Sequence, residues 1–212
     1  MNRAGPKKLK NEDPTGTNEA EMARDSPRKS GPVDGEPGTI LTIDDLVLRP
    51  WRLEDAPEVL AICQDPEIAR WVTIPQPFQS ADADAFIQNA LTMWRDGTGA
   101  AFAIVDAATD RLLGAVTRFG PDGHQATFGL WLAPNARGRG VGSRSLRQVA
   151  DWTFATTAAI RLDTFIMVGN EASNRMVERA GFRREGVLRA WDLHHDGVPV
   201  DCVVHSRIRG DG

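Results

Sequence analysis

The chain has 212 residues, 41% of them hydrophobic and 25% charged, with a net charge of −4 at pH 7; these values are typical of a soluble globular protein with one large domain, or one domain and a tail. It contains no tyrosine, which excludes every mechanism that needs a phenol as acid, base or nucleophile. Its two cysteines, Cys63 and Cys202, are too few for a disulfide framework or a thiolate metal site, and they favour a reducing, cytoplasmic setting.

The composition changes near Gly38. All four lysines lie in the first 29 residues, whereas residues 38–212 hold 18 arginines and no lysine. Residues 1–37 are rich in proline, glycine and serine and poor in aliphatic side chains, so we expect a disordered tail followed by a single domain over 38–212. No apolar stretch follows the basic start, which argues against a signal peptide. No apolar run reaches the ~18 residues of a membrane span, and the acidic domain argues against nucleic acid as a partner.

The sequence pattern of the first half of the domain predicts one strand and several helices. A strand is expected over residues 45–52. A helix is expected to open at residues 53–57, because acidic residues and a proline suit a first helical turn. A short helical turn over 67–71 and a proline-containing loop follow. Ser80 is expected to cap a longer helix, whose apolar residues follow helical spacing and which ends at Gly97.

The second half alternates strands and helices. Tight turns separate the first three expected strands, which therefore form an antiparallel meander. A long helix with apolar residues at helical spacing follows, and the chain ends in a hairpin around Asp196-Gly197. The expected strands are residues 101–105, 112–119, 126–132, 160–168, 187–193 and 198–208, and the expected helices are 140–157 and 170–180. This order predicts a mixed α/β fold.

The most informative segment joins the strand at 126–132 to the long helix. Gly138, Gly140 and Gly142 alternate there, and glycines allow a phosphate to approach the backbone closely. The free N–H groups and dipole of the helix start favour an anion, and Arg137 and Arg139 add cationic donors. The spacing is that of neither a Walker A loop nor a G-x-G-x-x-G fingerprint. The alternative interpretation is an ordinary glycine turn.

Two motifs carry a resemblance to a known family. The pattern Arg137-x-x-Gly140-x-Gly142 resembles the Arg/Gln-x-x-Gly-x-Gly/Ala signature of the GNAT acyltransferase superfamily. The segment from Asn170 to Asn174, followed by Gly181-Phe182, is similar to the RimJ/RimL-type branch. The resemblance covers about residues 44–209. It implies the GNAT fold, a mixed and mostly antiparallel sheet with splayed central strands and flanking helices.

The resemblance also implies an activity and a donor site. It implies an N-acetyltransferase that moves an acetyl group from acetyl-CoA to a primary amine, a protein N-terminus or a small cationic amine, by direct attack in a ternary complex and without a metal. The donor would lie between the splayed strands 126–132 and 160–168, with a backbone N–H near Leu132 facing the oxyanion. The implied CoA-binding residues are Leu132, Arg137, Gly138, Arg139, Gly140, Val141, Gly142, Ser143 and Asn170.

The helix after the strand 160–168 carries the implied catalytic residues. Asn170 is a natural N-cap, and by resemblance its side chain also contacts CoA. In many GNAT enzymes a tyrosine seven residues after this asparagine protonates the departing thiolate, but that position here is Val177. Ser173 lies one helical turn before Val177, on the same face, and RimJ/RimL-type enzymes are thought to use such a serine. Ser173 is therefore the expected acid, and its alternative role is in the N-terminal hydrogen bonds of the helix.

The general base and the acceptor stay open. Many relatives carry a glutamate where this chain has Thr127, and a threonine is no base. The other candidates are His124, Glu67, Asp192, His194, His195 and Asp201, or a bound water. Trp71 is the expected acceptor-binding residue, with core packing as its alternative.

The missing glutamate and tyrosine leave a second function open. The chain would then be a non-catalytic module that binds acyl-CoA or a protein partner and has kept the phosphate loop. The sequence does not define the acyl group, the acceptor amine or the oligomeric state, a homodimer included.

Overall fold

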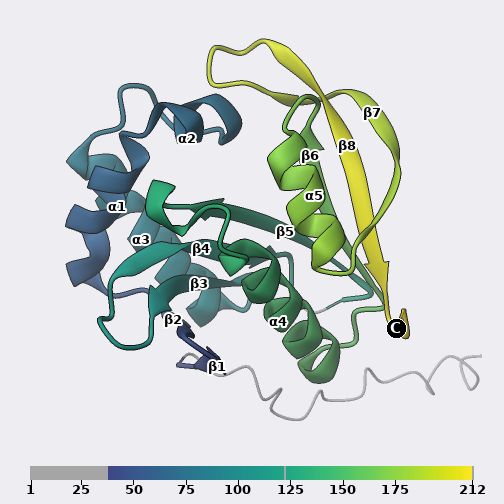
Figure 1. The fold of residues 1–212 in the computed structure, drawn as a ribbon, viewed down its shortest axis with the longest axis horizontal. Coiled ribbons are helices and arrows are strands. Elements are labelled where there is room, and N and C mark those ends of the chain that lie inside the picture. Colours follow the sequence, from purple (N-terminus) through teal and green to yellow (C-terminus); the bar gives the residue numbers. More distant parts are fainter. Residues whose placement is uncertain (1–37, 122, 212) are drawn as a thin grey trace, which may run out of the picture. The chain divides into compact units, whose positions relative to one another are not determined.

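The computed structural model describes residues 38–121 and 123–211, and the expected disordered tail, residues 1–37, lies outside them. Figure 1 shows a mixed α/β fold built around one sheet. Among the described residues the sheet has eight strands in the order β1-β2-β3-β4-β5-β6-β8-β7. They are β1 (Leu41–Ile43), β2 (Leu46–Pro50), β3 (Gly99–Asp106), β4 (Leu112–Phe119), β5 (Gln125–Leu132), β6 (Arg161–Met167), β7 (Arg183–Leu193) and β8 (Pro199–Ile208).

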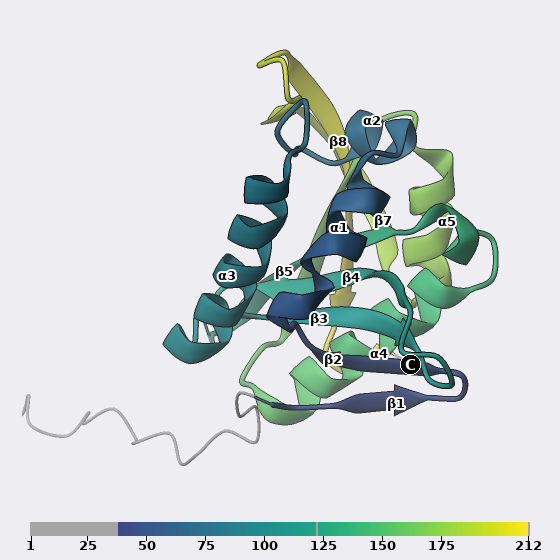
Figure 2. The same ribbon diagram turned by 90° about the vertical axis from the view of Figure 1, so that its left-hand side faces the viewer.

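Helices cover both faces of the sheet (Figure 2). The helices of the first half of the domain lie on one face, and the two α-helices of the second half cover the opposite face. The α-helices are α1 (Ala56–Cys63), α2 (Pro66–Trp71), α3 (Ser80–Asp96), α4 (Val141–Thr156) and α5 (Glu171–Arg179), and the short 3-10 helices are η1 (Leu53–Asp55) and η2 (Pro134–Ala136). Strand β3 supplies the core on both sides, because its alternate residues point to opposite faces.

The expected meander, long helix and final hairpin are confirmed, with bounds that agree to within two residues apart from differences at three places. Strand β1, three residues long, was not expected, and it pairs with β2 through a turn in which Asp44 has a φ of 47°. Strand β7 begins at Arg183, four residues earlier than expected. The expected N-cap of α3 is wrong: Ser80 is its first helical residue, and Gln79 is the N-cap, whose backbone N–H donates to Asp82.

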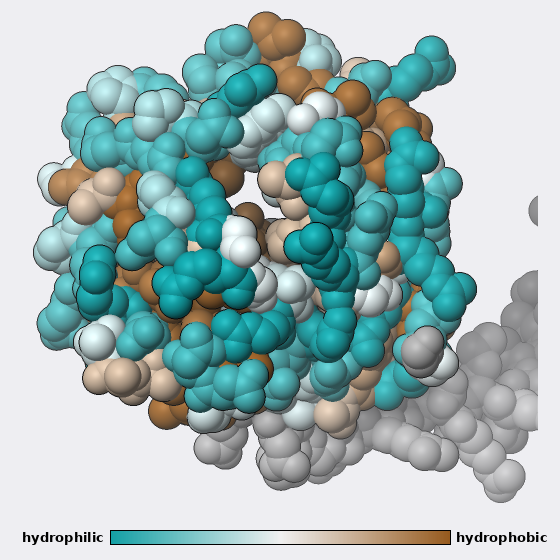
Figure 3. Space-filling model, in the orientation of Figure 1, coloured by the Kyte–Doolittle hydropathy of each residue, from teal (hydrophilic) through white to brown (hydrophobic). Residues whose placement is uncertain are grey.

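The central strands splay as expected. Strands β5 and β6 are parallel, and they pair over four positions, Gln125–Phe128 against residues 161–164. Beyond Phe128 and Thr164 the pairing stops, although both strands continue for three or four residues. In Figure 3 the surface is hollowed between the segment that carries α2 and the segment that carries α5. We call the space between residues 129–132 and 165–167 the strand gap.

Candidate active site

Strand β5 turns backbone groups of its last residues toward the strand gap. The Ala133 N–H donates to the Leu113 carbonyl at 2.9 Å, and Leu132 pairs with Gly114. Because the N–H groups of an antiparallel strand alternate between its two sides, those of Leu130 and Leu132 point away from β4, toward the gap. The Leu132 side chain packs against the core under α4 and α5. The residue expected to face an oxyanion therefore has its N–H on the side where the gap lies.

Glycine is favoured at the three alternating positions for two different reasons. Gly138 and Gly140 have φ angles of 71° and 75°, which favour glycine, and a Cβ at either would meet no atom within 4 Å. Gly142 instead is needed for packing, because a Cβ there would lie 3.1 Å from Met176 Cγ and 3.2 Å from Leu132 Cδ1. The first two glycines thus leave the backbone open on the loop. The third brings β5, α4 and α5 into contact.

The first turn of α4 completes the loop. Gly140 is the N-cap of this 16-residue helix, and Val141 at its start is buried. The Ser143 hydroxyl donates to the Gly140 carbonyl at 3.2 Å. The first N–H groups of a helix lack intrahelical acceptors and carry positive potential. Open glycine backbone beside such a helix start fits the pyrophosphate that the sequence motif predicts.

The two loop arginines differ in their surroundings. Arg139 is exposed and donates to the Asn135 carbonyl at 3.3 Å. Arg137 folds back onto the end of β5, where its Nη2 lies 3.1 Å from the Leu132 carbonyl oxygen and 2.6 Å from Asp65 Oδ2. The guanidinium expected to meet a phosphate thus joins the loop to the N-cap of α2.

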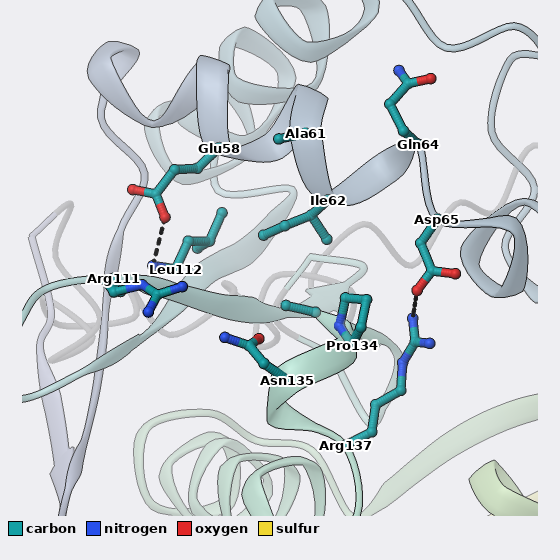
Figure 4. Close-up of a pocket in the computed structure, with 11 residues that line it drawn as sticks. Glu58, Ala61, Ile62, Gln64, Asp65, Arg111, Leu112, Pro134, Asn135 and Arg137 are labelled. Carbon is teal, nitrogen blue, oxygen red and sulfur yellow. Dashed lines mark hydrogen bonds and ion pairs between the residues drawn. The ribbon is translucent and has the colours of Figure 1, made fainter.

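A cavity of about 870 Å³ lies next to this ion pair, and both Asp65 and Arg137 line it. Figure 4 shows Glu58 and Asp65 on its α1 side and Asn135 and Arg137 on the η2 side. The Glu58 carboxylate accepts from the Leu112 N–H at 3.0 Å. The cavity borders the phosphate loop, and its charged lining consists of two acids and two arginines: Glu58, Asp65, Arg111 and Arg137.

The N-terminus of α5 holds the expected catalytic residues. Asn170 is its N-cap, and the Asn170 Oδ1 accepts from the Ser173 N–H at 3.0 Å. This bond uses the backbone of Ser173, so the half-buried hydroxyl is not needed for the cap. Val177, at the position of the usual phenol, is buried at 1% exposure.

Asn174 is a residue of this turn that the sequence reasoning missed. Its side-chain Nδ2 donates to the carbonyl of the N-cap Asn170 at 2.9 Å and so holds the first turn of α5. The side chain is buried, and its Oδ1 has no hydrogen-bond partner among the described residues. The signal that could have identified it is a polar residue four positions after an N-cap, on the apolar side of a helix.

Trp71 lies beside the turn that carries Asn170. A Cβ at Gly169 would lie 3.7 Å from the Trp71 ring. The indole Nε1–H donates to Glu67 at 3.1 Å, and the Arg70 guanidinium lies 4.6 Å from the ring centroid. The segment after Trp71 also touches the last hairpin, because the Thr73 hydroxyl lies 3.2 Å from the Leu193 carbonyl oxygen. Helix α2 thus borders the gap next to α5.

The candidate bases are spread over several places. Thr127, which is no base, pairs with Asp163 across β5 and β6, and that carboxylate is buried beside Arg161 at 2.6 Å. Glu67 is bound to Trp71, and Asp201 accepts from the Ala190 N–H at 2.8 Å. The His194 ring lies between Asp196 and the Arg70 carbonyl, each 3.3 Å away. Three further candidates, His124, Asp192 and His195, are exposed.

Cysteine and metal chemistry find no support in the described part of the chain. Both cysteines are free and buried. Burial raises the pKa of Cys63 to about 11, and burial with the nearby carboxylates of Asp192 and Asp201 raises the pKa of Cys202 to about 11. Neither thiol is therefore a thiolate near neutral pH. Among the described residues, no group of three His, Cys, Asp or Glu could hold a metal ion, and no helix is long and apolar enough to span a membrane.

The chain is similar to known acetyltransferases over most of its length. Residues 45–183 match the family described as "Acetyltransferase (GNAT) domain". The uncharacterized N-acetyltransferase YoaA of Bacillus subtilis (strain 168) is 26% identical over 172 residues, which are 80% of this chain and 97% of YoaA.

Two solved structures illustrate the shared fold. A putative ribosomal-protein-serine acetyltransferase from Vibrio cholerae has a TM-score of 0.73 and 24% identity, covering 82% of this chain and 99% of that chain. RimJ from Mycobacterium smegmatis, in complex with CoA-disulfide, has a TM-score of 0.71 and 21% identity, covering 82% and 88%. At these identities the two structures show the fold that the chain shares with them.

Proposed function

Since the chain belongs to the GNAT acetyltransferase family and is an acetyl-CoA-dependent N-acetyltransferase, we propose which of its residues perform the transfer. The loop of Gly138 and Gly140 with the first turn of α4 holds the donor pyrophosphate. The Leu132 N–H donates to the developing oxyanion. Ser173 donates to the departing sulfur, and Asn170 holds the start of α5 in place. The domain of residues 38–212 is the catalytic unit.

One contact supports this assignment above the others. Leu132 and Met176 both lie so close to Gly142 that a Cβ there would be crowded, at 3.2 and 3.1 Å from their side chains. Met176 is one turn after Ser173 on α5, so it lies on the same helix face. The end of β5, the phosphate loop and the turn of Ser173 are therefore neighbours, and a bound thioester has an N–H donor on one side and a hydroxyl on the other.

The chemistry follows from these positions. The free amine attacks the thioester carbonyl carbon, the carbonyl oxygen gains negative charge, and the C–S bond then breaks. The Ser173 hydroxyl gives its proton to the sulfur and regains one from the ammonium through water. Because a serine hydroxyl is a weak acid, this donation accompanies the bond breaking. The acceptor is a primary amine that enters past α2 and Trp71.

Replacing Ser173 by alanine tests the assignment. Ser173→Ala keeps the backbone N–H that Asn170 caps, so the fold is retained. We expect kcat to fall about 10²-fold or more with little change in the KM for acetyl-CoA. Ser80→Ala, an exposed serine in the first turn of α3, is the matched control. An unchanged kcat in Ser173→Ala would remove the proposed acid.

The non-catalytic module makes a different prediction. It would bind CoA tightly, yet no amine would release free thiol from acetyl-CoA with the wild-type protein.

A cytoplasmic location is part of the proposal, since both cysteines are free. A homodimer is tested by the mass of the protein in solution.

A further inference from the structure

The strand gap has two differently lined faces. Thr127 pairs with Asp163 and Phe128 with Thr164. Because side chains alternate along a strand, residues 129 and 131 of β5 share a face with residues 165 and 167 of β6. Trp131 identifies that face, since it packs beside Trp51 and Phe86 in the core under α1 and α3. It is the face opposite to α4, α5 and the phosphate loop, and under the proposed function the acceptor enters there.

Aromatic side chains line both walls of this face. On the β5 wall the Trp131 ring is half-buried, with its centroid 6.1 Å from that of Phe86. On the β6 wall Phe165 stacks on Trp191 of β7, with ring centroids 4.7 Å apart and planes tilted by 30°. Trp191 is 52% exposed. An exposed tryptophan that stacks on a half-buried phenylalanine offers a planar apolar surface to a ligand.

The splayed segments of β5 and β6 carry no charged residue on this face. The four residues of the splayed segments that point to this face are Gly129, Trp131, Phe165 and Met167. The carboxylate nearest in the ladder, Asp163, is 1% exposed and lies against Arg161. The splayed segments themselves therefore offer a polycation no carboxylate, and its desolvation against them would be unfavourable. The exposed carboxylates of Glu67 and Asp192 lie outside these segments.

We propose that the acceptor is a primary amine with an aromatic group close to its nitrogen, bound between Trp131 and the Phe165–Trp191 pair. The inference rests on the proposed function and specifies its acceptor. Two sources share this chemistry, an arylalkylamine and a peptide whose first residue is aromatic. In either, the ring lies on the apolar walls and the amine points toward the thioester. Polyamines and aminoglycosides, with several ammonium groups, are poor acceptors.

A panel of amines tests the proposal. Thiol release from acetyl-CoA is measured with 2-phenylethylamine, Phe-Ala amide, Ser-Ala amide and spermidine. We expect kcat/KM for 2-phenylethylamine or Phe-Ala amide to exceed that for Ser-Ala amide and spermidine at least tenfold, and the better of the two identifies the source. Equal or higher kcat/KM with Ser-Ala amide or spermidine would overturn the aromatic acceptor and leave the acetyltransferase intact. No thiol release with any amine would instead overturn the proposed function.

Variants locate the binding surface. Trp191→Ala removes an exposed ring, so the protein should fold, and we expect the KM for the aromatic amine to rise about tenfold while the KM for acetyl-CoA stays constant. Phe165→Leu, which keeps an apolar side chain, should raise the same KM by a smaller factor. Ile160→Ala is the matched control, because Ile160 is 53% exposed and precedes the paired end of β6. An unchanged KM for the aromatic amine in both Trp191→Ala and Phe165→Leu would refute the site.

Discussion

The ion pair between Asp65 and Arg137 connects the phosphate loop to α2, and its two halves can be separated by mutation. Asp65 Oδ2 lies 2.6 Å from Arg137 Nη2, with the two side chains 13% and 36% exposed. Asp65 Oδ1 also caps α2 by accepting from the Glu67 N–H at 2.8 Å. Asp65→Asn removes the charge and keeps a good capping residue. Asp65→Ala removes both interactions.

The exposure of the pair sets the size of each effect. Exposed ion pairs contribute about 0.2–1 kcal/mol, and breaking a buried pair costs about 3–5 kcal/mol. For this half-buried pair we expect Asp65→Asn to lower the free energy of unfolding by about 1–2 kcal/mol. The lost cap adds about 1 kcal/mol in Asp65→Ala. In a domain of this size each kcal/mol lowers Tm by about 2–4 °C.

Urea unfolding of four proteins measures the coupling directly. The wild type, Asp65→Asn, Arg137→Ala and the double variant form a double-mutant cycle. We expect the double variant to be about 1–2 kcal/mol more stable than the sum of the single effects predicts. Asp96→Asn is the control, because the Asp96–Arg95 pair is exposed at the end of α3, and it should leave the stability close to that of the wild type.

The same variants should impair donor binding. Arg137 also holds the Leu132 carbonyl, so releasing it loosens the end of β5 and the loop. We expect the KM for acetyl-CoA to rise in both Asp65→Asn and Arg137→Ala. Strictly additive stability effects, or a wild-type KM in both variants, would refute the view that this pair positions the loop.

Two further predictions concern the packing around α5. His205 is fully buried, 3.8 Å from Glu178, and burial, with a smaller effect of Arg184, lowers its pKa while Glu178 opposes the shift. Since the fold favours the neutral ring, the stabilisation is complete above the unfolded pKa of about 6.5 and is lost as the pH falls through the lower folded pKa. The urea midpoint should therefore drop more steeply from pH 7 to pH 5 in the wild type than in His205→Gln. The control His124→Gln, at an exposed histidine, should behave like the wild type. An equally steep drop in the wild type and in His205→Gln would contradict this reasoning. Gly142→Ala should lower the free energy of unfolding by about 1–3 kcal/mol, because the new methyl group overpacks against Met176 and Leu132. Adding Met176→Ala to this variant should restore part of the lost stability, measured by thermal unfolding. A Gly142→Ala protein as stable as the wild type would disprove the close contact.

The sequence predicts those elements whose pattern is local. Strand β4 has the expected bounds, Leu112–Phe119, because an apolar run lies between two turns. Strand β1 has three residues, too few for a periodic signal, and its pairing with β2 creates it. The start of β7, Arg183 to Glu185, is charged and exposed at the edge of the sheet. No apolar alternation marks such a segment, so its strand character comes from pairing with β8.

The same limit applies to the candidate site. The N-cap role of Asn170 is confirmed because a cap is a local interaction that residue type predicts. The partner of Arg137 could not be predicted, because Asp65 belongs to a different element and meets the loop only in the folded chain. The aromatic walls likewise depend on the register of β5 with β6 and on the ring contact that Trp191 of β7 makes with Phe165 of β6 across β8. Motifs therefore predict a donor loop, whereas a prediction for the acceptor side requires the tertiary structure.

Among the described strands, β5 and β6 form the one parallel pair, and this pairing has an electrostatic consequence. Parallel neighbours end at the same edge of the sheet and need a crossover between them. Strand β5 leads into α4, and β6 leads into α5, so both helices begin at that one edge. Two helix N-termini therefore add their positive potential at the mouth of the strand gap. In an antiparallel arrangement one of the two helices would start at the opposite edge, and the attraction for a polyanionic donor would be divided between two ends of the molecule.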